Sequence, residues 1–260
     1  MNIIDKIDKY LLNREHTSSG NHHPSGATKC IRQQYYARTK IVEESNPITP
    51  GALWKMEMGN AIHSMLTDFL RNSGLYVRDE ISFKKKLDGL KNPISGRIDN
   101  LFQENGATTG IEIKTSYGRG VMNLQKSGQP KEDALIQVAL YLWCTNVTKF
   151  YILYVGRDNA YRCQFLVEKD KSGSILLEGK DTGLTFNNVC KKFFDLEKAL
   201  DKQILPDREF KAAIKNGEVK DYFQKKGVKY KTDWQCTYCN YKDVCWKSEC
   251  EKYKEGDNCE

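Results

Sequence analysis

Three side chains near the middle of the chain have the types and the spacing that a divalent-metal site needs. They are Asp99 in the segment GRID and the pair Glu112 and Lys114 in the segment IEIK. In a β-strand the side chains of residues i and i+2 point to the same face. Glu112 and Lys114 therefore project side by side, and the isoleucines that alternate with them face the core.

The chemistry that suits such a triplet is the hydrolysis of phosphodiesters. The carboxylates of Asp99 and Glu112 can share a hard cation such as Mg²⁺ or Mn²⁺. An ammonium group at Lys114 can orient a water molecule or neutralise charge that develops on a phosphate. The strand otherwise has a buried composition, and an acid and a base buried there without partners would be costly. Charged residues two positions apart also occur on exposed strands, so the pair by itself leaves an exposed, non-catalytic strand open as the alternative.

This arrangement resembles the PD-(D/E)XK nuclease superfamily, and two further segments narrow the resemblance to its RecB-like branch. The segment GNAIHSML places His63 on a helix before the metal-binding strands. The segment QVALY places Gln137 and Tyr141 on a helix after them. These two residues are four positions apart and share one face of the helix. All four elements occur in the order that is typical of the branch.

The resemblance implies a role for each of these residues. The implied catalytic residues are Asp99, Glu112, Lys114, Gln137 and Tyr141. The implied metal ligands are His63, Asp99, Glu112 and the backbone carbonyl of Ile113. A neutral imidazole adds a nitrogen ligand, which favours Mn²⁺ relative to Mg²⁺. A histidine at the edge of an apolar helix face and a Gln–Tyr pair can also be ordinary structural residues.

The nine cysteines indicate a second metal site. Three follow the pattern Cys236-x2-Cys239-x5-Cys245, and Cys30 lies more than two hundred residues earlier. A C-x2-C hairpin places two thiolates at chelating distance, and such soft ligands favour zinc or an iron–sulfur cluster. The odd cysteine count and an N-terminal segment too charged for a signal peptide argue against disulfides. Spacing alone leaves both metals open.

The same four cysteines are similar to those of the CRISPR-associated Cas-four family and of AddB-type nuclease domains. In those families one early and three late cysteines hold a 4Fe–4S cluster that joins the two ends of the nuclease. The resemblance extends over residues 25–246. It implies that Cys30, Cys236, Cys239 and Cys245 hold such a cluster, with structural Zn²⁺ as the alternative. We expect Cys144, Cys163 and Cys190 to be packing residues. Cys250 and Cys259 lie in the charged tail, and either could replace a cluster ligand, although neither has the spacing of the family.

The composition suits a polyanionic partner. The chain has 260 residues, of which 39% are hydrophobic and 29% charged, and its net charge is +7, a sign that favours nucleic acid. The stretches Lys84–Lys86 and Lys211–Lys231 are locally basic, and the second also carries aromatic residues that can stack on single-stranded bases. A solvated helix face would have a similar composition. The expected nucleic-acid contacts are Arg32, Lys84, Lys85 and Tyr141.

We expect an α/β fold with a mixed central sheet flanked by helices. It should form a restriction-endonuclease-like core with a helical cap that the iron–sulfur cluster staples. Helices are expected over 3–14, 27–40, 51–73, 131–146 and 182–203. Strands are expected over 75–87, 93–103, 108–115, 149–156 and 160–168, and a mobile loop over 116–130. The expected parts are an N-terminal helix and loop (1–26), the capped core (27–205), a basic cysteine-bearing segment (206–246) and a charged tail (247–260).

Together these features predict a Mg²⁺- or Mn²⁺-dependent deoxyribonuclease, preferably an exonuclease that acts at single-stranded DNA ends in recombination, repair or CRISPR adaptation. The expected partners are DNA and a helicase, recombination or CRISPR adaptation protein, and an oligomer is left open. No apolar run reaches the length of a membrane span, so we expect a cytoplasmic protein without a membrane partner. Two alternatives stay open, a structure-specific endonuclease and a catalytically silent DNA-binding subunit of a larger complex.

Overall fold

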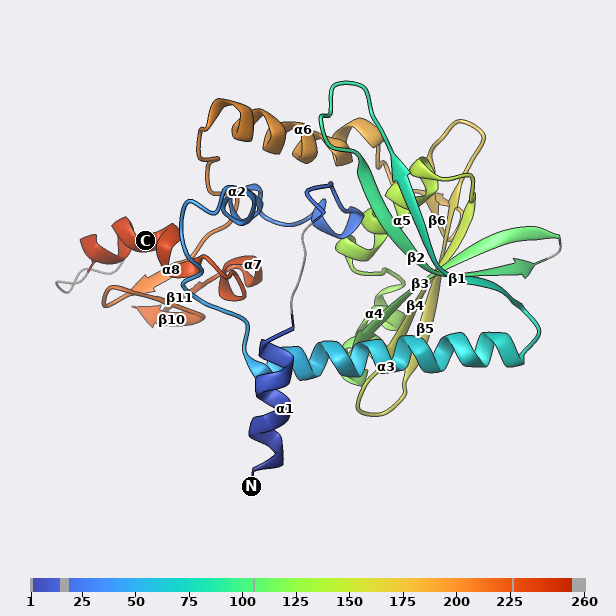
Figure 1. Ribbon diagram of the computed structural model, residues 1–260, viewed down its shortest axis with the longest axis horizontal. Helices are drawn as coiled ribbons and strands as arrows, with labels where there is room; N and C mark the ends of the chain where they lie inside the picture. The colour runs from blue at the N-terminus through green and yellow to red at the C-terminus, as the bar shows by residue number, and fades with distance from the viewer. Residues whose placement is uncertain (1, 15–18, 105, 226, 254–260) are drawn as a thin grey trace. The chain divides into compact units, whose positions relative to one another are not determined.

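Figure 1 shows the computed structural model of the chain, which describes residues 2–14, 19–104, 106–225 and 227–253. The chain divides into two compact units. Unit 1 is formed by Met1–Thr28 and Pro50–Phe194, and unit 2 by Lys29–Thr49 and Asp195–Glu260. The start of the expected loop 16–26, the end of the expected tail and Cys259 lie outside the described residues. The expected division into four parts stays a prediction.

Unit 1 is built on a seven-stranded sheet with the strand order β1-β2-β3-β4-β5-β6-β7. The strands are β1 (Tyr76–Lys85), β2 (Ile94–Glu104), β3 (Ala107–Ser116), β4 (Lys149–Gly156), β5 (Arg162–Lys169), β6 (Ile175–Leu177) and β7 (Lys180–Asp181). β3 and β4 pair in parallel and the other neighbours are antiparallel, so the sheet is mixed. Parallel neighbours need a crossover connection. The chain supplies it through α4 (Gly118–Ser127) and α5 (Glu132–Cys144).

One face of this sheet is covered by α3 (Pro50–Asn72). Ile111 and Ile113 of β3 form a buried cluster there with Phe102 of β2. Two leucines one turn apart on α3, Leu66 and Leu70, pack against the cluster. The residues of β3 that alternate with the isoleucines must therefore point to the other face.

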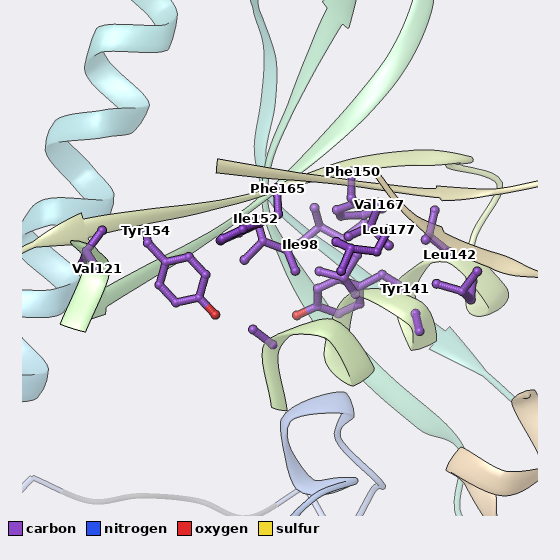
Figure 2. Packing of buried hydrophobic residues seen from close by; sticks show 14 residues of the cluster. Ile98, Val121, Tyr141, Leu142, Phe150, Ile152, Tyr154, Phe165, Val167 and Leu177 are labelled. Atoms are coloured by element: carbon purple, nitrogen blue, oxygen red, sulfur yellow. The ribbon is translucent and has the colours of Figure 1, made fainter. Parts of the chain in front are cut away.

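The other face is covered by α5. Figure 2 shows Tyr141 and Leu142 of this helix among Phe150 and Ile152 of β4 and Val167 of β5. Each of these five side chains is at most 2% exposed. Because helices cover both faces, the polar side chains of β3 that face α5 are also enclosed. The expected α/β class, with a mixed central sheet flanked by helices, is confirmed.

Three further elements complete unit 1. The helix α1 (Ile3–Leu12) begins at Asn2, whose side chain accepts a hydrogen bond from the Ile4 N–H at 3.1 Å and so caps the helix. A short 3₁₀ helix, η1 (Pro24–Gly26), contacts α5. The first half of α6 (Phe186–Lys202) buries Val189, Cys190 and Phe193 in a second apolar cluster.

Unit 2 joins two segments that are far apart in the sequence. It contains α2 (Ile31–Thr39), the second half of α6, α7 (Trp234–Thr237), α8 (Lys242–Lys252) and two hairpins. The hairpins are β8 (Ala213–Lys215) with β9 (Glu218–Lys220), and β10 (Tyr222–Lys225) with β11 (Val228–Lys231). Tyr35 and Tyr36 of α2 share one buried cluster with Leu196, Cys239 and Tyr241. The early segment is thus part of the core of unit 2.

The expectation of a mobile loop over 116–130 is wrong, because α4 occupies most of it. The glycines that suggested a loop mark the ends of this helix. Gly118 opens it, donates its N–H to Asp158 Oδ1 at 2.6 Å, and lies so close to Asn159 that a Cβ would clash with that side chain. Gly128 ends it with a φ of +65°, a conformation that glycine adopts without strain.

The C-terminal region is also more ordered than its sequence suggested. The expected charged tail begins inside α8, and both hairpins of unit 2 were missed, so this unit is not purely helical. Strands of three or four residues are too short to show a period in the sequence. Among the residues that the structure describes, no helix combines the length and the apolar composition that a bilayer crossing requires.

A buried pair of polar side chains fixes α3 on the sheet. Thr67 of α3 and Asn100 of β2 are 7% and 1% exposed, and Thr67 Oγ1 lies 3.0 Å from Asn100 Oδ1. We expect Thr67→Val to lower the free energy of unfolding by about 1–3 kcal/mol, because Asn100 then lacks its partner. Urea denaturation measures this change.

The matched control is a double-mutant cycle. Asn100→Leu alone should also destabilise, whereas Thr67→Val together with Asn100→Leu should cost less than the sum of the two, because no polar group is left unpaired. Strictly additive losses would contradict a direct Thr67–Asn100 bond.

Candidate active site

The site begins where β2 and β3 separate. The paired residues of these strands run from Glu104 with Ala107 to Asn100 with Ile111. One residue further along β2, the side chain of Asp99 takes over as acceptor: its Oδ2 receives the N–H of Ile113 at 2.7 Å. This bond holds the carboxylate of Asp99 against β3 although the two backbones no longer pair there.

Glu112, Lys114 and Gln137 form a closed triangle of hydrogen bonds between β3 and α5. Lys114 Nζ lies 2.7 Å from Glu112 Oε1 and 2.8 Å from Gln137 Oε1. Gln137 Nε2 donates to Glu112 Oε1 at 2.8 Å. The amide of Gln137 therefore binds the acid through its nitrogen and the base through its oxygen.

Tyr141 fixes the orientation of that amide. Gln137 Nε2 also donates to the Tyr141 hydroxyl at 2.7 Å, and the hydroxyl in turn donates to the backbone carbonyl of Arg97 at 3.0 Å. Tyr141 is 2% exposed and packs between Phe83 and Phe150, with ring centroids 5.6 Å away on each side. Its ring is enclosed between these two neighbours and its hydroxyl holds Gln137 in place, whereas the expected DNA contact of Tyr141 stays a prediction.

The environment of Glu112 is unusual for a carboxylate. The residue is 2% exposed, and burial, followed by the nearby charge of Asp99, raises the pKa of Glu112 to about 7 in spite of Lys114. Its Oε1 has two partners. Its Oε2 is one of two buried side-chain oxygens in the described part of the chain that lack a hydrogen bond. A buried oxygen of this kind is expected to have a ligand, an ion or water as its partner.

His63 approaches the same group from α3. Its Nδ1 lies 3.6 Å from Asp99 Oδ2. Burial acts to lower the pKa of His63, but the hydrogen bond and charge of Asp99 together with the charge of Glu112 outweigh it, so that the pKa is raised. Thr67 lies one turn further along α3, and its bond to Asn100 keeps this helix face on β2.

These residues fit a hard divalent cation. Within the described ranges, no three His, Cys, Asp or Glu side chains already stand at metal-coordinating positions. The donors nevertheless have the right chemistry, because Asp99 and Glu112 supply oxygens and His63 supplies a nitrogen. The unpartnered, buried Oε2 of Glu112 is the observation that carries the fit, since a cation there would compensate it.

The four cysteines of the expected cluster come together in unit 2. Cys30, Cys236, Cys239 and Cys245 line one cavity, beside the ring of Trp246. Burial, and then the proximity of the other sulfurs, raises the pKa of Cys236 and of Cys239 to about 11. Within the part of the chain that the structure describes, these sulfurs do not already stand at metal-coordinating positions.

The other cysteines lie elsewhere. Cys190 is fully buried in the apolar cluster around Phe193, whereas Cys144 and Cys163 are half-buried beside apolar residues. Cys250 is a half-buried residue of α8.

Two of the four expected nucleic-acid contacts are exposed, whereas Tyr141 is buried and Arg32 is half-buried. Lys84 and Lys85 are exposed at the end of β1, an edge strand of the sheet. Arg32 instead donates its Nε to the carbonyl of Pro206 at 2.6 Å and places Nη1 3.8 Å from Cys245 Sγ. Arg32 thus joins Pro206 to the cysteine segment of unit 2, and its expected DNA contact stays a prediction.

Three residues whose hydrogen bonds hold the site residues in place were not predicted from the sequence. Thr67, Asn100 and the carbonyl of Arg97 each make a hydrogen bond on which a site residue depends. A weak signal exists for two of them: Thr67 follows His63 by one helical turn, and Asn100 follows Asp99 directly.

Comparisons with known proteins bear on the fold. No protein-family model matches the chain, and no curated protein matches it either. The chain is similar to a crystal structure of SSO0001, with 16% identity, a TM-score of 0.52 and coverage of 93% of both chains. The similarity extends over nearly the whole length and supports a shared fold.

Two other solved structures are less similar. An alkaline exonuclease (LHK-Exo) from Laribacter hongkongensis has 14% identity and a TM-score of 0.48, with 71% of this chain and 89% of that chain covered. A phage related exonuclease from Haemophilus somnus 129PT has 11% identity and a TM-score of 0.43, with 76% of this chain and 99% of that chain covered.

The raised pKa of Glu112 predicts a pH-dependent stability. The folded protein binds this proton more tightly than the unfolded chain, so the contribution is fully present below pH 4.5 and is lost as pH rises through about 7. Measured without metal, the free energy of unfolding of the wild type should fall between these two pH values. The fall should exceed that of Glu112→Gln by on the order of 2 kcal/mol.

The same group allows a test of the cation. Mn²⁺ should raise the melting temperature of the wild type more at pH 8 than at pH 5, because the cation competes with the proton on Glu112. Glu112→Gln should show little of this shift. An equal shift in both proteins would mean that the cation binds elsewhere.

Proposed function

We propose that the protein is a divalent-metal-dependent nuclease of the PD-(D/E)XK superfamily, of its RecB-like branch, and that it removes nucleotides from single-stranded DNA ends. The observation that carries the proposal is the triangle of Glu112, Lys114 and Gln137 around a buried carboxylate that has one oxygen left unpartnered. A silent binding subunit would have no use for a buried acid and base at this cost.

The proposed cation is Mg²⁺ or Mn²⁺, and its ligands are Asp99, Glu112, His63 and the backbone carbonyl of Ile113. When bound, such a cation supplies Lewis acidity to a phosphoryl group and lowers the pKa of water. The hydrogen bond from the Ile113 N–H keeps Asp99 turned toward Glu112. The chain thus holds two carboxylates close together in an enclosed place, where they attract a cation.

Lys114 acts on the reacting groups. Two of the three N–H bonds of its ammonium group point to Glu112 and Gln137, which leaves the third for a water molecule or a phosphate oxygen. Its side chain is 29% exposed, so the group can reach substrate while it stays anchored. Gln137 positions Lys114, and Tyr141 in turn holds the amide of Gln137.

We further propose that Cys30, Cys236, Cys239 and Cys245 hold a 4Fe–4S cluster, with Zn²⁺ as the alternative. The convergence of the four thiols on one cavity of unit 2 supports a shared metal group. The group would tie residues 29–49 to the C-terminal segment. Closing so long a loop restricts the unfolded chain and so stabilises the folded one.

Cleavage is tested with single-stranded DNA labelled separately at its 5′ and 3′ ends, in the presence of Mn²⁺. We expect Lys114→Ala to lower the rate by about 100-fold or more, because it removes a donor to developing charge. Lys126→Ala, which removes an exposed lysine of α4, should cleave like the wild type.

Lys114→Met serves as a second variant that keeps the length of the side chain, and circular dichroism shows whether each variant is folded. Cleavage by a folded Lys114 variant at the wild-type rate would refute the assignment. Cleavage of a circular single strand would replace the exonuclease by an endonuclease.

The cluster is tested by colour and stability. We expect protein purified without oxygen to be brown, and Cys239→Ala to lose the colour and to melt at a lower temperature. Cys250→Ala, in the neighbouring helix, should keep both. A colourless wild type that contains zinc would select the alternative, and a colourless wild type no more stable than Cys239→Ala would refute both the iron and the staple.

A further inference from the structure

The strands β10 and β11 form a hairpin of unit 2 (Figure 1). The residues on its two faces differ in character. Its cross-strand pairs include Tyr222 with Lys231 and Gln224 with Lys229. Because alternate residues of a strand share a face, these four side chains lie together on one side. All four are exposed, and Tyr222 is 63% exposed.

The opposite face anchors the hairpin. Phe223 is buried and stacks on its cross-strand partner Tyr230, with ring centroids 4.8 Å apart and an interplanar angle of 12°. Lys215 of the neighbouring hairpin lies over the Phe223 ring at 5.9 Å. One aromatic pair thus holds the ribbon in place, and the face with Tyr222 is left outward.

The outward face combines one aromatic ring with two cations. Lys229 Nζ lies 4.9 Å from the centroid of the Tyr222 ring, and Lys231 is directly opposite Tyr222. None of the four residues on this face is acidic. The surrounding stretch from 211 to 231 contains seven lysines and two acidic residues, and one of those acids, Glu218, is paired with Lys220.

A polyanion with flat apolar groups complements such a face. An exposed tyrosine in water gains by stacking on a base, and lysines on the same face reach the phosphates on either side. A base is free to stack only when it is not already stacked within a duplex. A protein or a membrane would complement the charge but would not explain a tyrosine flanked by two lysines.

We propose that this ribbon face, formed by Tyr222, Gln224, Lys229 and Lys231, binds single-stranded DNA. Tyr222 stacks on one base, and Lys229 and Lys231 contact neighbouring phosphates. The choice of DNA rests on the proposed nuclease function, and the ribbon adds to it a binding surface separate from the residues that carry out cleavage.

The test measures the binding of the full-length protein to fluorescein-labelled oligodeoxythymidylate by anisotropy, with EDTA present so that no cleavage occurs. We expect Tyr222→Ala to weaken binding about 10-fold and Tyr222→Phe to bind like the wild type, because stacking needs the ring and not the hydroxyl. The double variant Lys229→Ala, Lys231→Ala should reduce the slope of log K against log salt by about 1.4, the value for two phosphate contacts on a single strand.

The matched control is Lys247→Ala with Lys252→Ala, which removes the same charge from exposed positions of α8 in the same unit. This control should leave the affinity for DNA within about two-fold of the wild type. If lysines attracted DNA unspecifically, the control would lose as much affinity as the ribbon variant does. Wild-type affinity of the ribbon variants, an equal loss in this control, or an equal loss for a blunt duplex would each overturn the inference.

The two proposals fail in different ways. If Lys114→Ala abolishes cleavage while Tyr222→Ala binds normally, the ribbon inference is wrong and the nuclease stands. If the ribbon variants lose binding in a protein that never cleaves, the single-strand surface stands and the nuclease is wrong.

Discussion

The buried carboxylate of Glu112 is the constraint on which unit 1 depends. An ionised carboxyl group removed from water is strongly destabilising unless charges and hydrogen bonds surround it. Lys114 reaches the carboxylate from the same strand, whereas Gln137 reaches it only because α5 crosses that face of the sheet. The crossover through α4 and α5 is also what allows β3 and β4 to pair in parallel. The same helix therefore closes the core and completes the polar site.

Periodicity predicted which site residues share one face of an element, whereas the meeting of the two elements followed only from the family resemblance. Alternation along β3 places Glu112 and Lys114 on one face, and a spacing of four does the same for Gln137 and Tyr141 on α5. Their burial could not be predicted in the same way. The burial of Tyr141 depends on α5 packing on the sheet, a contact between segments that are distant in the sequence.

Unit 2 shows a different limit. The local C-x2-C spacing predicted a metal site at Cys236 and Cys239, whereas Cys30 was included only through the family resemblance. In the structure all four thiols line one cavity. The hairpins β8–β9 and β10–β11 were not predicted from the sequence. Lysine-rich strands of three or four residues lack apolar alternation and are too short to show a period. The hydrogen bond of Arg32 to the carbonyl of Pro206 could not be predicted either, because these two residues are neighbours only in the folded chain.

The bond between Asp99 and the backbone of Ile113 gives this carboxylate two tasks at once. It is an acid within reach of His63, and it is also the acceptor that substitutes for a missing strand partner at an N–H of a residue only 1% exposed. Alanine at position 99 would remove both, and an unpaired buried N–H has a cost of its own. An alanine substitution there would confuse the loss of a ligand with the loosening of the strand junction. Asparagine keeps an amide oxygen that can still accept the N–H of Ile113. At this position it would therefore remove the negative charge and keep the hydrogen bond that joins the two strands.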